Sequence, residues 1–488
     1  MLDLNLLLLV FSYLNTAATS ATRSRQIDTN STLFFPILTT TANTTPLLRS
    51  KHDLQSSSRA LRAAQISNLS GSALLKTTGS SFLAEITLGS QTFLSVVDTG
   101  SSDTWIARSD FTCVDIITNA TKPQSKCYFG GTYTPDNQFH QIANENFNIT
   151  YGDGEYLTGP VGTISVTLAN VRVPSQQVSL ATLAAWEGDG QTSGIIGLAY
   201  PALTAAYPGT DPRVDKYCKP GATPQNSGCN QVEYSSLTNT IFFSERLTAP
   251  VFALALSRDE SNSGNGGYLS IGGIPPLDLV GVKSGVFAST PIKVLPGDSK
   301  FRYYLISIDG LVMLPAGTPL PAEGASKLGV EVRSKGSGRR PRPHPHTSSF
   351  SNAVTPSSLP VTPNSQADYI LDSGTTLSFF PSQMTTKYNA MFNPPATLDP
   401  YTGFWLVKCG SSPPPLGVKI GGQVFFHNGK ELVKQFDATR CVSGIQDSGR
   451  LGGVNILGDV FLDNVLAVFD LTQGNSKVWF AGRRDYMS

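Results

Sequence analysis

The amino-acid sequence predicts an all-β protein, mainly strands, built as two related lobes. Three observations carry this prediction. Of the 488 residues, 40% are hydrophobic, 45 are glycine, 32 are proline and only 15% are charged, which is typical of turn-rich strand proteins. The chain is too long for a single core, so we expect two domains with appendages. A short apolar run that ends in Asp, a hydroxyl residue and Gly occurs once in each half.

The first lobe is expected over residues 77–290. Runs with alternating or continuous apolar residues predict strands at 82–88, 93–97, 147–151, 161–168, 251–256 and 268–271. A short helix is expected at 235–243.

The second lobe is expected over residues 291–488, with a further series of strands between 303 and 480. Its first two strands are predicted at 303–313 and 369–371, and a short helix at 381–391. The start of this lobe therefore contains a long gap between neighbouring strands.

That gap, residues 315–367, is dense in Pro, Ser, Gly and Arg. Such a composition cannot bury a core, so we predict a flexible insertion that serves as a processing or interaction loop. An intron read through into the sequence is the alternative. A spliced message that lacks the codons for 329–359 would remove the loop hypothesis.

The first residues have the pattern of a secretory signal peptide, predicted at 1–21. The stretch from Leu4 to Leu14 is almost wholly apolar, and small residues follow through Ala21. The apolar stretch is too short to span a bilayer. We therefore expect secretion, with the vacuole as an alternative destination. No membrane anchor is expected, because no apolar tail follows Arg484.

Residues 22–76 are predicted to be a removable basic prosegment. The stretch is rich in Ser and Thr and carries seven Lys or Arg residues against Asp28 and Asp53. A cation that lies in an acidic cleft would neutralise its carboxylates and block the site until acid breaks the pairing. A disordered glycosylated leader is the alternative. Five Asn-x-Ser/Thr sequons agree with the secretory route and are candidate glycosylation sites: Asn30, Asn43, Asn68, Asn119 and Asn148.

The cysteines and the charge limit the classes of partner and cofactor. The six cysteines form three couples that are close in sequence: Cys113 with Cys127, Cys218 with Cys229, and Cys409 with Cys441. An even count suits disulfides in an oxidising compartment, although the sequence alone leaves their connectivity open. No Cys-x-x-Cys or paired-His spacing supports the alternative of zinc, so we expect no metal and no cofactor. A net charge of +1 gives no field that would gather nucleic acid.

The two apolar runs that end in aspartate are the strongest chemical feature of the sequence. The first reads Val-Val-Asp98-Thr99-Gly100-Ser101-Ser. The second reads Ile-Leu-Asp372-Ser373-Gly374-Thr375-Thr. An apolar strand delivers the carboxylate to a buried place, Gly allows a sharp turn, and hydroxyls can bond the carboxylate oxygens. Either motif alone would be read as a turn with a capping aspartate; the duplication argues for function.

Two such loops that meet at a pseudo-twofold axis would place Asp98 and Asp372 side by side. Like charges that close cannot both ionise, so the pair would share one proton, as in the dyad of the aspartic proteases. The ionised carboxylate can then take a proton from a water molecule while the other carboxyl bonds the scissile carbonyl. The pattern therefore predicts peptide hydrolysis at acidic pH.

At this point the chain resembles the pepsin-like aspartic endopeptidases, in particular secreted fungal members, over roughly residues 80–484. Trp105 follows Asp98 at the spacing Asp-Thr-Gly-Ser-Ser-x-x-Trp, and Ile-Thr-Tyr151-Gly152-Asp153-Gly is similar to the flap hairpin of that family. Apolar-apolar-Gly segments at 195–197 and 456–458 are similar to the strands beside each catalytic loop. The resemblance implies a bilobal fold with the active site between the lobes.

The resemblance also implies roles for individual residues. Ser101 and Thr375 would bond the outer carboxylate oxygens, and Thr99 and Ser373 would lock the two loops together across the lobes. Tyr151 would close over substrate and bond Trp105; an ordinary cross-strand tyrosine and a core tryptophan are the alternatives. Disulfides would join Cys113 to Cys127 and Cys409 to Cys441. Asp153 would allow lysine on the N-terminal side of the scissile bond, because an aspartate at this position is associated with accepting a basic residue there in secreted fungal relatives.

We thus expect a monomeric zymogen whose partners are polypeptide substrates and its own prosegment, acting as an intramolecular inhibitor. A catalytically silent binding protein or inhibitor of the same fold is the first alternative, because fold alone does not guarantee activity. A serine hydrolase is the second, but the sequence has no Gly-x-Ser-x-Gly elbow.

Overall fold

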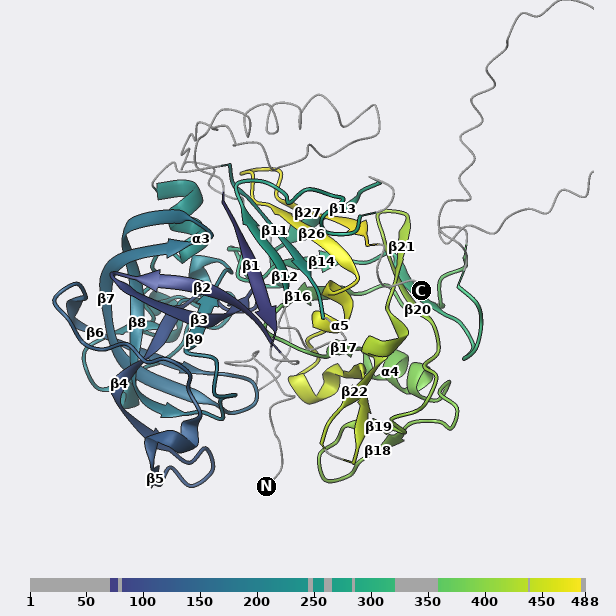
Figure 1. The fold of residues 1–488 in the computed structure, drawn as a ribbon, viewed down its shortest axis with the longest axis horizontal. Helices are drawn as coiled ribbons and strands as arrows, with labels where there is room; N and C mark the ends of the chain where they lie inside the picture. The colour runs from purple at the N-terminus through teal and green to yellow at the C-terminus, as the bar shows by residue number, and fades with distance from the viewer. Residues whose placement is uncertain are drawn as a thin grey trace, which may run out of the picture.

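A computed structural model describes residues 71–77, 81–244, 249–258, 266–282, 286–320, 359–437 and 439–483. These residues form two β-rich lobes that lie side by side and are joined by a shared sheet, so the predicted all-β, bilobal fold is confirmed (Figure 1). The predicted signal peptide and Asn30, Asn43 and Asn68 lie outside the described residues. No helix in the described ranges combines the length and apolar character needed to cross a membrane.

The shared sheet joins strands from three distant parts of the sequence. Its antiparallel order, among the described residues, is β1 (Gly71–Thr77), β12 (Gly267–Ile271), β11 (Val251–Leu256), β26 (Val465–Asp470), β27 (Lys477–Gly482) and β13 (Ala288–Lys293). All six residues of β26 are buried, as expected for a continuous apolar strand covered on both faces. Residues 71–76, the end of the predicted prosegment, form most of β1.

The N-terminal lobe is a highly bent antiparallel sheet with two parallel crossings. Its strands are β2 (Phe82–Leu88), β3 (Gln91–Asp98), β4 (Thr104–Val114), β5 (Thr121–Lys122), β6 (His140–Thr150), β7 (Tyr156–Leu168), β8 (Val171–Ala185), β9 (Gly194–Gly197) and β10 (Ala206–Pro208). The predicted strand at 82–88 matches β2, and the predicted helix at 235–243 is found as α3 (Leu237–Asn239) followed by a π-turn (Thr240–Ser244).

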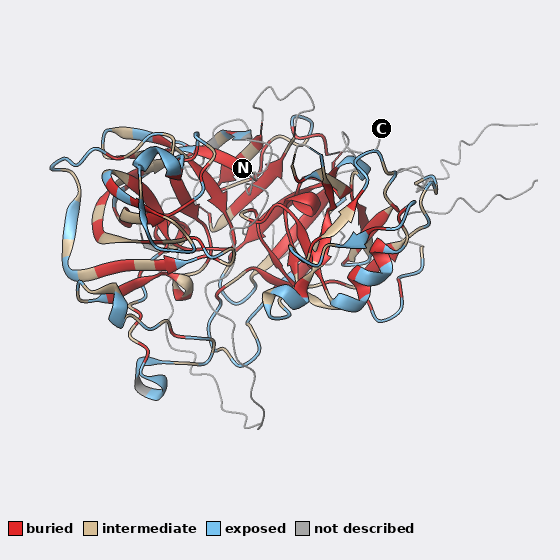
Figure 2. Ribbon diagram, turned by 90° about the horizontal axis from the view of Figure 1, so that it is seen from below, coloured by how far each residue is buried: buried red, intermediate tan, exposed pale blue. Residues whose placement is uncertain are grey.

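The C-terminal lobe contains β14 (Leu305–Ser307), β15 (Gly310–Met313), β16 (Asp368–Leu371), β17 (Ser378–Phe380), α4 (Ser382–Asn389), β18 (Thr397–Leu398), β19 (Trp405–Val407), β20 (Leu416–Ile420), β21 (Gln423–Phe426), β22 (Val433–Gln435), β23 (Cys441–Ser443), β24 (Ile445–Asp447), β25 (Ile456–Leu457) and α5 (Asp459–Leu462). The single strand expected at 303–313 is divided, because Gly310 takes a φ of 146° that a side chain would not tolerate. Buried residues line the strands of both lobes, as the red ribbon in Figure 2 shows.

The two lobes repeat one topological unit. In the first, β9 runs parallel to β3 and antiparallel to β4, with Val96 opposite Ile195. In the second, β25 runs parallel to β16 and antiparallel to β17, with Ile370 opposite Ile456. The apolar-apolar-Gly segments therefore thread beside the two aspartate strands, as the sequence predicted.

The edges of the predicted insertion belong to the folded C-terminal lobe. Thr362 donates a backbone hydrogen bond to Leu311, and the Ser365 hydroxyl accepts one from the same residue. Leu359 packs against the cluster around Val312. The rest of the predicted insertion, 321–358, lies outside the described residues.

All three predicted cysteine couples form disulfides: Cys113–Cys127, Cys218–Cys229 and Cys409–Cys441. The second closes an excursion of the N-terminal lobe, residues 206–236, which the sequence did not place. The buried guanidinium of Arg302 ties this excursion to the approach to β14 by bonds to the Ala202 carbonyl (2.7 Å) and the Tyr217 hydroxyl (2.8 Å).

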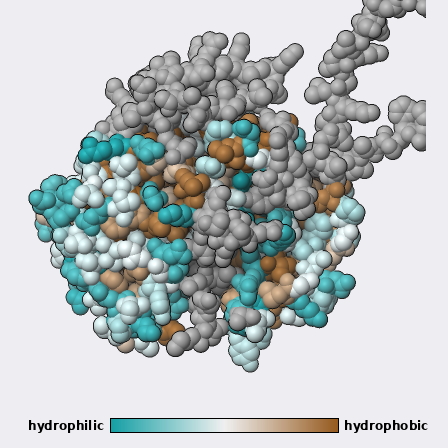
Figure 3. Space-filling view, viewed as in Figure 1, coloured by the Kyte–Doolittle hydropathy of each residue, from teal (hydrophilic) through white to brown (hydrophobic). Residues whose placement is uncertain are grey.

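The surface of the described residues is mixed. Figure 3 shows hydrophilic residues over much of the N-terminal lobe, with hydrophobic ones in smaller spots. Large apolar side chains that are exposed, such as Ile117, Leu279 and Tyr401, come from separate parts of the chain. Scattered exposed apolar residues are normal on a folded protein and do not mark an interface.

Candidate active site

Asp98 and Asp372 hold equivalent places in the two lobes. Asp98 is the last residue of β3, Asp372 follows β16 directly, and both side chains are fully buried. The backbone N–H of Gly100 donates to Asp98 Oδ1 (2.7 Å), and that of Gly374 donates to Asp372 Oδ1 (2.9 Å). Each loop thus turns back so that its own amide supports its carboxylate.

Hydroxyl groups complete the support of the two carboxyl groups. The Ser101 hydroxyl donates to Asp98 Oδ2, and Thr375 Oγ1 donates to Asp372 Oδ2 at 2.6 Å. Such bonds favour an ionised carboxylate and fix its rotamer. The geometry is that expected for Ser101 and Thr375 from the sequence.

Thr99 and Ser373 join the two loops across the lobes. Thr99 Oγ1 donates to the Leu371 carbonyl (2.9 Å) and accepts from the Ser373 amide (2.9 Å). Ser373 Oγ donates to the Val97 carbonyl (2.7 Å) and accepts from the Thr99 amide (3.1 Å). Four buried bonds related by the pseudo-twofold axis thus hold the loops in register.

These contacts bring the carboxyl groups of Asp98 and Asp372 within hydrogen-bonding reach of each other. A Cβ atom placed on Gly100 would lie 2.5 Å from Asp372 Oδ1, so only glycine allows this approach. Burial raises the pKa of Asp98. Burial and the Asp98 charge raise the pKa of Asp372 well above its usual value. Two carboxyl groups this close cannot easily both ionise, so the arrangement can hold one proton between them.

The β6–β7 hairpin, predicted as the flap, carries Tyr151 at its tip. The Trp105 indole N–H donates to the Tyr151 hydroxyl at 2.7 Å, and both side chains are buried. Trp186, which the sequence analysis missed, packs edge-on against Trp105 and Tyr151 with ring centroids 5.2 and 6.1 Å apart. Three aromatic side chains therefore fix the tip of the hairpin.

Two acids follow Tyr151 in this hairpin. Asp153 Oδ1 accepts from the Glu155 amide (2.9 Å), and the buried Glu155 carboxyl accepts from the Glu187 amide (2.7 Å) while bonding Asp153. Burial, with a smaller contribution from the Glu187 charge, raises the pKa of Asp153 to about 7. Burial and the Asp153 charge raise the pKa of Glu155 well above its usual value. Gly152 lies between Tyr151 and this pair and is partly exposed.

Asp103 is a further buried acid behind the first loop, and sequence reasoning missed it. Its carboxylate accepts from the Tyr234 hydroxyl (2.6 Å) and the Ala205 amide (3.0 Å), and it is fully buried. Burial raises the pKa of Asp103 to about 6. The available sequence signal was an acid directly before the buried run that starts at Thr104. It did not indicate which residue would bond this acid.

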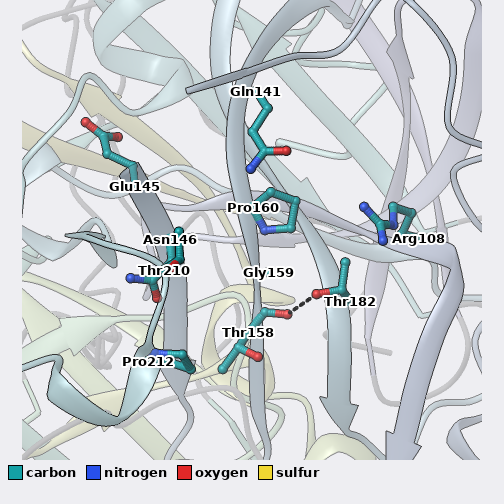
Figure 4. A pocket seen from close by; sticks show the side chains of 10 residues that line it. All are labelled: Arg108, Gln141, Glu145, Asn146, Thr158, Gly159, Pro160, Thr182, Thr210 and Pro212. Carbon is teal, nitrogen blue, oxygen red and sulfur yellow. Dashed lines mark hydrogen bonds between the residues drawn. The ribbon is translucent and has the colours of Figure 1, made fainter. Parts of the chain in front are cut away.

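A cavity of about 290 Å³ lies elsewhere on the N-terminal lobe, between β6, β7, β8 and the excursion (Figure 4). Its polar lining includes Arg108, Glu145 and Thr182, and none of the residues predicted for the active site. Within the described ranges, no group of three His, Cys, Asp or Glu side chains is arranged to hold a metal ion.

The two described sequons differ in their freedom to carry a sugar. Asn119 is exposed and its side-chain oxygen accepts from the Tyr156 hydroxyl. The Asn148 amide nitrogen, where a sugar would be attached, donates instead to the Pro212 carbonyl (2.9 Å) and to Asp215 (3.1 Å). The geometry therefore favours Asn119 over Asn148.

Comparison with known proteins agrees with this arrangement. The family model for eukaryotic aspartyl protease matches residues 81–311 and 350–482. A probable aspartic-type endopeptidase of Aspergillus fumigatus is 34% identical over 83% of this chain and 79% of its own length. Rhizopuspepsin-2 of Rhizopus niveus is 26% identical over 76% of this chain and 71% of its own. The aspartic proteinase of Irpex lacteus superposes with a TM-score of 0.56 at 18% identity, covering 86% of this chain and 98% of that structure.

Proposed function

Because this chain belongs to the eukaryotic aspartyl protease family and is an aspartic-type peptide hydrolase, we propose that it cleaves proteins internally at acidic pH through a water molecule activated by Asp98 and Asp372. The observation that carries the proposal is the close approach of these two buried carboxyl groups, each held by matching bonds from Gly100 or Gly374 and from a loop hydroxyl.

In the proposed first step, the ionised Asp98 takes a proton from the water whose oxygen attacks the scissile carbonyl carbon. Asp372 gives its proton to the carbonyl oxygen, so that a neutral gem-diol forms without a covalent enzyme adduct. In the second step, Asp98 returns its proton to the leaving nitrogen, the C–N bond breaks, and a diol hydroxyl returns a proton to Asp372. The charge of the pair is the same before and after the cycle.

The flap would close over the peptide with Tyr151 held by Trp105, which excludes water from the reacting bond. The loop hydroxyls of Ser101 and Thr375 hold the outer carboxylate oxygens, so the inner oxygens face the water. Positioning of this kind gives catalysis because the reacting groups need no reorganisation.

We also propose that the protein is made as a secreted zymogen, with 1–21 as signal peptide and 22–76 as prosegment. A basic residue of the prosegment would pair with the carboxylates of the cleft at neutral pH and release them on acidification. In this proposal Asn119 carries a glycan, and the enzyme is a monomer that acts on polypeptides.

The decisive experiment acidifies the purified full chain, sequences the new N-terminus and measures cleavage of a peptide library. The native chain should become active and lose activity with a statine-type inhibitor. Asp98→Asn and Asp372→Asn should each lower kcat by at least about 10³-fold, the scale of general acid–base catalysis. A silent binding protein would show no inhibitor-sensitive cleavage, and full activity in either variant would refute the dyad.

A further inference from the structure

Behind the second catalytic loop lies a buried group of charges that the mechanism does not use. Arg258 lies two residues after the end of the sheet strand β11, and its side chain is 9% exposed. Its Nη2 donates to Asp459 Oδ2 at 3.0 Å, and its Nε donates to Asp463 Oδ2 at 3.0 Å. The two acids are four residues apart, so one planar guanidinium spans a full turn at α5.

The same helical turn holds the catalytic loop. The Asp459 amide donates to the Thr375 carbonyl (2.8 Å), and the Val460 amide donates to the Thr376 carbonyl (3.1 Å). Thr375 in turn bonds Asp372. A continuous chain of bonds therefore runs from Arg258 through Asp459 and the loop backbone to the catalytic carboxyl group.

Arg258 also reaches both halves of the molecule. Its guanidinium carbon lies 4.8 Å from the centre of the Phe82 ring on β2 of the N-terminal lobe, while α5 contacts β11 and β26 of the shared sheet. In Figure 1, α5 lies beside the shared sheet, between the two lobes. Arg258 therefore adds charged contacts to the packing that holds α5 against the shared sheet.

The charges around Arg258 do not balance locally at acidic pH. Its neighbours are the carboxyl groups of Asp459, Asp463 and Glu431, the ammonium of Lys434, which bonds Glu431, and the guanidinium of Arg483, which donates to the Asp463 carbonyl. The Glu431 charge acts to raise the pKa of His427, and the Asp372 charge acts to raise the pKa of Asp459. Burial raises the pKa of Asp463 to about 7 and that of Asp459 well above its usual value, so both hold protons in acid. Protonation of these two acids leaves the Arg258 charge less compensated, next to an Asp459 whose pKa responds to the charge of Asp372.

We propose that Arg258 is a positioning residue for catalysis, which holds α5 against the Asp372 loop and supplies the positive charge that favours the ionised dyad. This inference rests on the proposed function of Asp98 and Asp372. The role belongs to the second catalytic loop, because the carboxyl group behind the first loop, Asp103, accepts from neutral donors.

The test compares Arg258→Met and Arg258→Lys with Arg302→Met. Arg302 is another buried arginine that lies over an aromatic ring, but its guanidinium bonds Asp298, Ala202 and Tyr217, which lie outside the two catalytic loops. Arg258→Met should lower kcat about tenfold with little change in KM, and move both limbs of the pH profile of kcat up by about one unit. Arg258→Lys should keep the limbs near their native positions, because the charge remains, but recover only part of kcat. Arg302→Met should lower thermal stability without moving the limbs.

If Arg258→Met does not fold, Asp459→Ala and Asp459→Asn replace it. Asparagine retains an acceptor for Nη2 and should keep more activity than alanine. Hydrogen exchange of the segment that contains the Asp459 and Val460 amides gives a readout that needs no activity: protection should fall in Arg258→Met and Asp459→Ala, and persist in Arg302→Met.

Unmoved pH limbs together with unchanged amide protection would overturn the role of Arg258, whatever happens to stability. A native chain without inhibitor-sensitive cleavage would instead refute the proposed function, and the exchange experiment would still decide whether Arg258 holds the loop.

Discussion

The two lobes share a backbone plan at the active site but differ in what lies behind it. In both, an aspartate strand pairs in parallel with an apolar-apolar-Gly strand, and an amide and a hydroxyl support each carboxylate. Behind the first loop, the Asp103 carboxylate accepts hydrogen bonds from the Tyr234 hydroxyl and the Ala205 amide, whereas behind the second, Asp459 pairs with the charged Arg258. The backbone symmetry positions the pair, and the unlike surroundings let the two lobes respond differently to pH.

The most damaging test of the symmetry is Gly100→Ala. The new Cβ would lie 2.5 Å from the Asp372 carboxyl, so one loop must move away from the other. We expect kcat to fall by about 10²-fold, since a displacement of about 1 Å is enough for such a loss. Gly410→Ala, where a Cβ meets no atom within 4 Å, is the control. Native activity in Gly100→Ala would mean that the loops do not approach each other as described.

The cross-lobe hydroxyl pair tests whether the two loops are equivalent in stability. Thr99→Val leaves the Leu371 carbonyl and Ser373 amide without their buried partner, and Ser373→Ala leaves the Val97 carbonyl and Thr99 amide. Each loss should lower the free energy of unfolding by about 2–6 kcal/mol, from two orphaned groups of about 1–3 kcal/mol each. Denaturant unfolding at acidic pH measures both, and clearly unequal losses would break the equivalence.

His427 in the C-terminal lobe should weaken the protein in strong acid. Burial lowers the pKa of His427 to about 4, below the usual value of 6.5. Its contribution to stability is therefore complete above pH 6.5 and is lost as the pH falls through 4, by about 3 kcal/mol in all. His427→Gln should remove this slope from thermal midpoints measured between pH 7 and 3. An unchanged slope would show that other groups cause the acid weakness.

The contribution of Asp103, in the N-terminal lobe, to stability should change with pH in the opposite direction. Its raised pKa of about 6 means that its contribution to stability is complete below pH 3.8 and is lost as the pH rises through 6, by about 3 kcal/mol. Asp103→Asn keeps an acceptor for Tyr234 and Ala205 without the titration. Thermal midpoints of this variant should decline less between pH 4 and 7 than those of the native chain, and a parallel decline would contradict the assignment.

The flap acids should give the N-terminal lobe a pH-dependent choice of substrate, with the smallest effect of the series. Because the pKa of Asp153 is raised to about 7, the carboxylate that would attract a lysine is mostly neutral in acid. The preference for lysine over leucine before the scissile bond should therefore rise with pH, by about threefold, the size of a partly exposed ion pair. Asp153→Asn should abolish this rise, and Glu187→Gln should move it to lower pH. Ratios of kcat/KM independent of pH would exclude the role of Asp153.

The fold and the paired loops could be predicted because each rests on local sequence. The β2 and β11 strands are short apolar runs between turns, and the dyad is indicated by one motif that occurs twice in the sequence. The disulfides were also paired correctly, since each joins cysteines that are close in the chain.

What the sequence did not reveal depends on contacts between distant residues. Three contacts form only when the chain folds. Asp103 bonds Tyr234, Trp186 packs against Tyr151, and Arg258 bonds Asp459. A single buried charge has no local pattern of its own, because its partner comes from whichever strand lies next to it. The division of 303–313 into two strands was missed for a similar reason, since a glycine alone does not reveal its φ.

The place of β1 at the margin of the shared sheet constrains where the chain can be cut during maturation. β1 covers β12, and Leu75 within it is fully buried. Cleavage at residue 76 would strip this strand away and leave the amides and carbonyls of β12 open to pairing with another molecule, a known route to aggregation. Cleavage before Gly71 would keep that margin closed. The end of the prosegment, proposed above at residue 76, is therefore expected before Gly71 unless the new terminus takes the place of the lost strand.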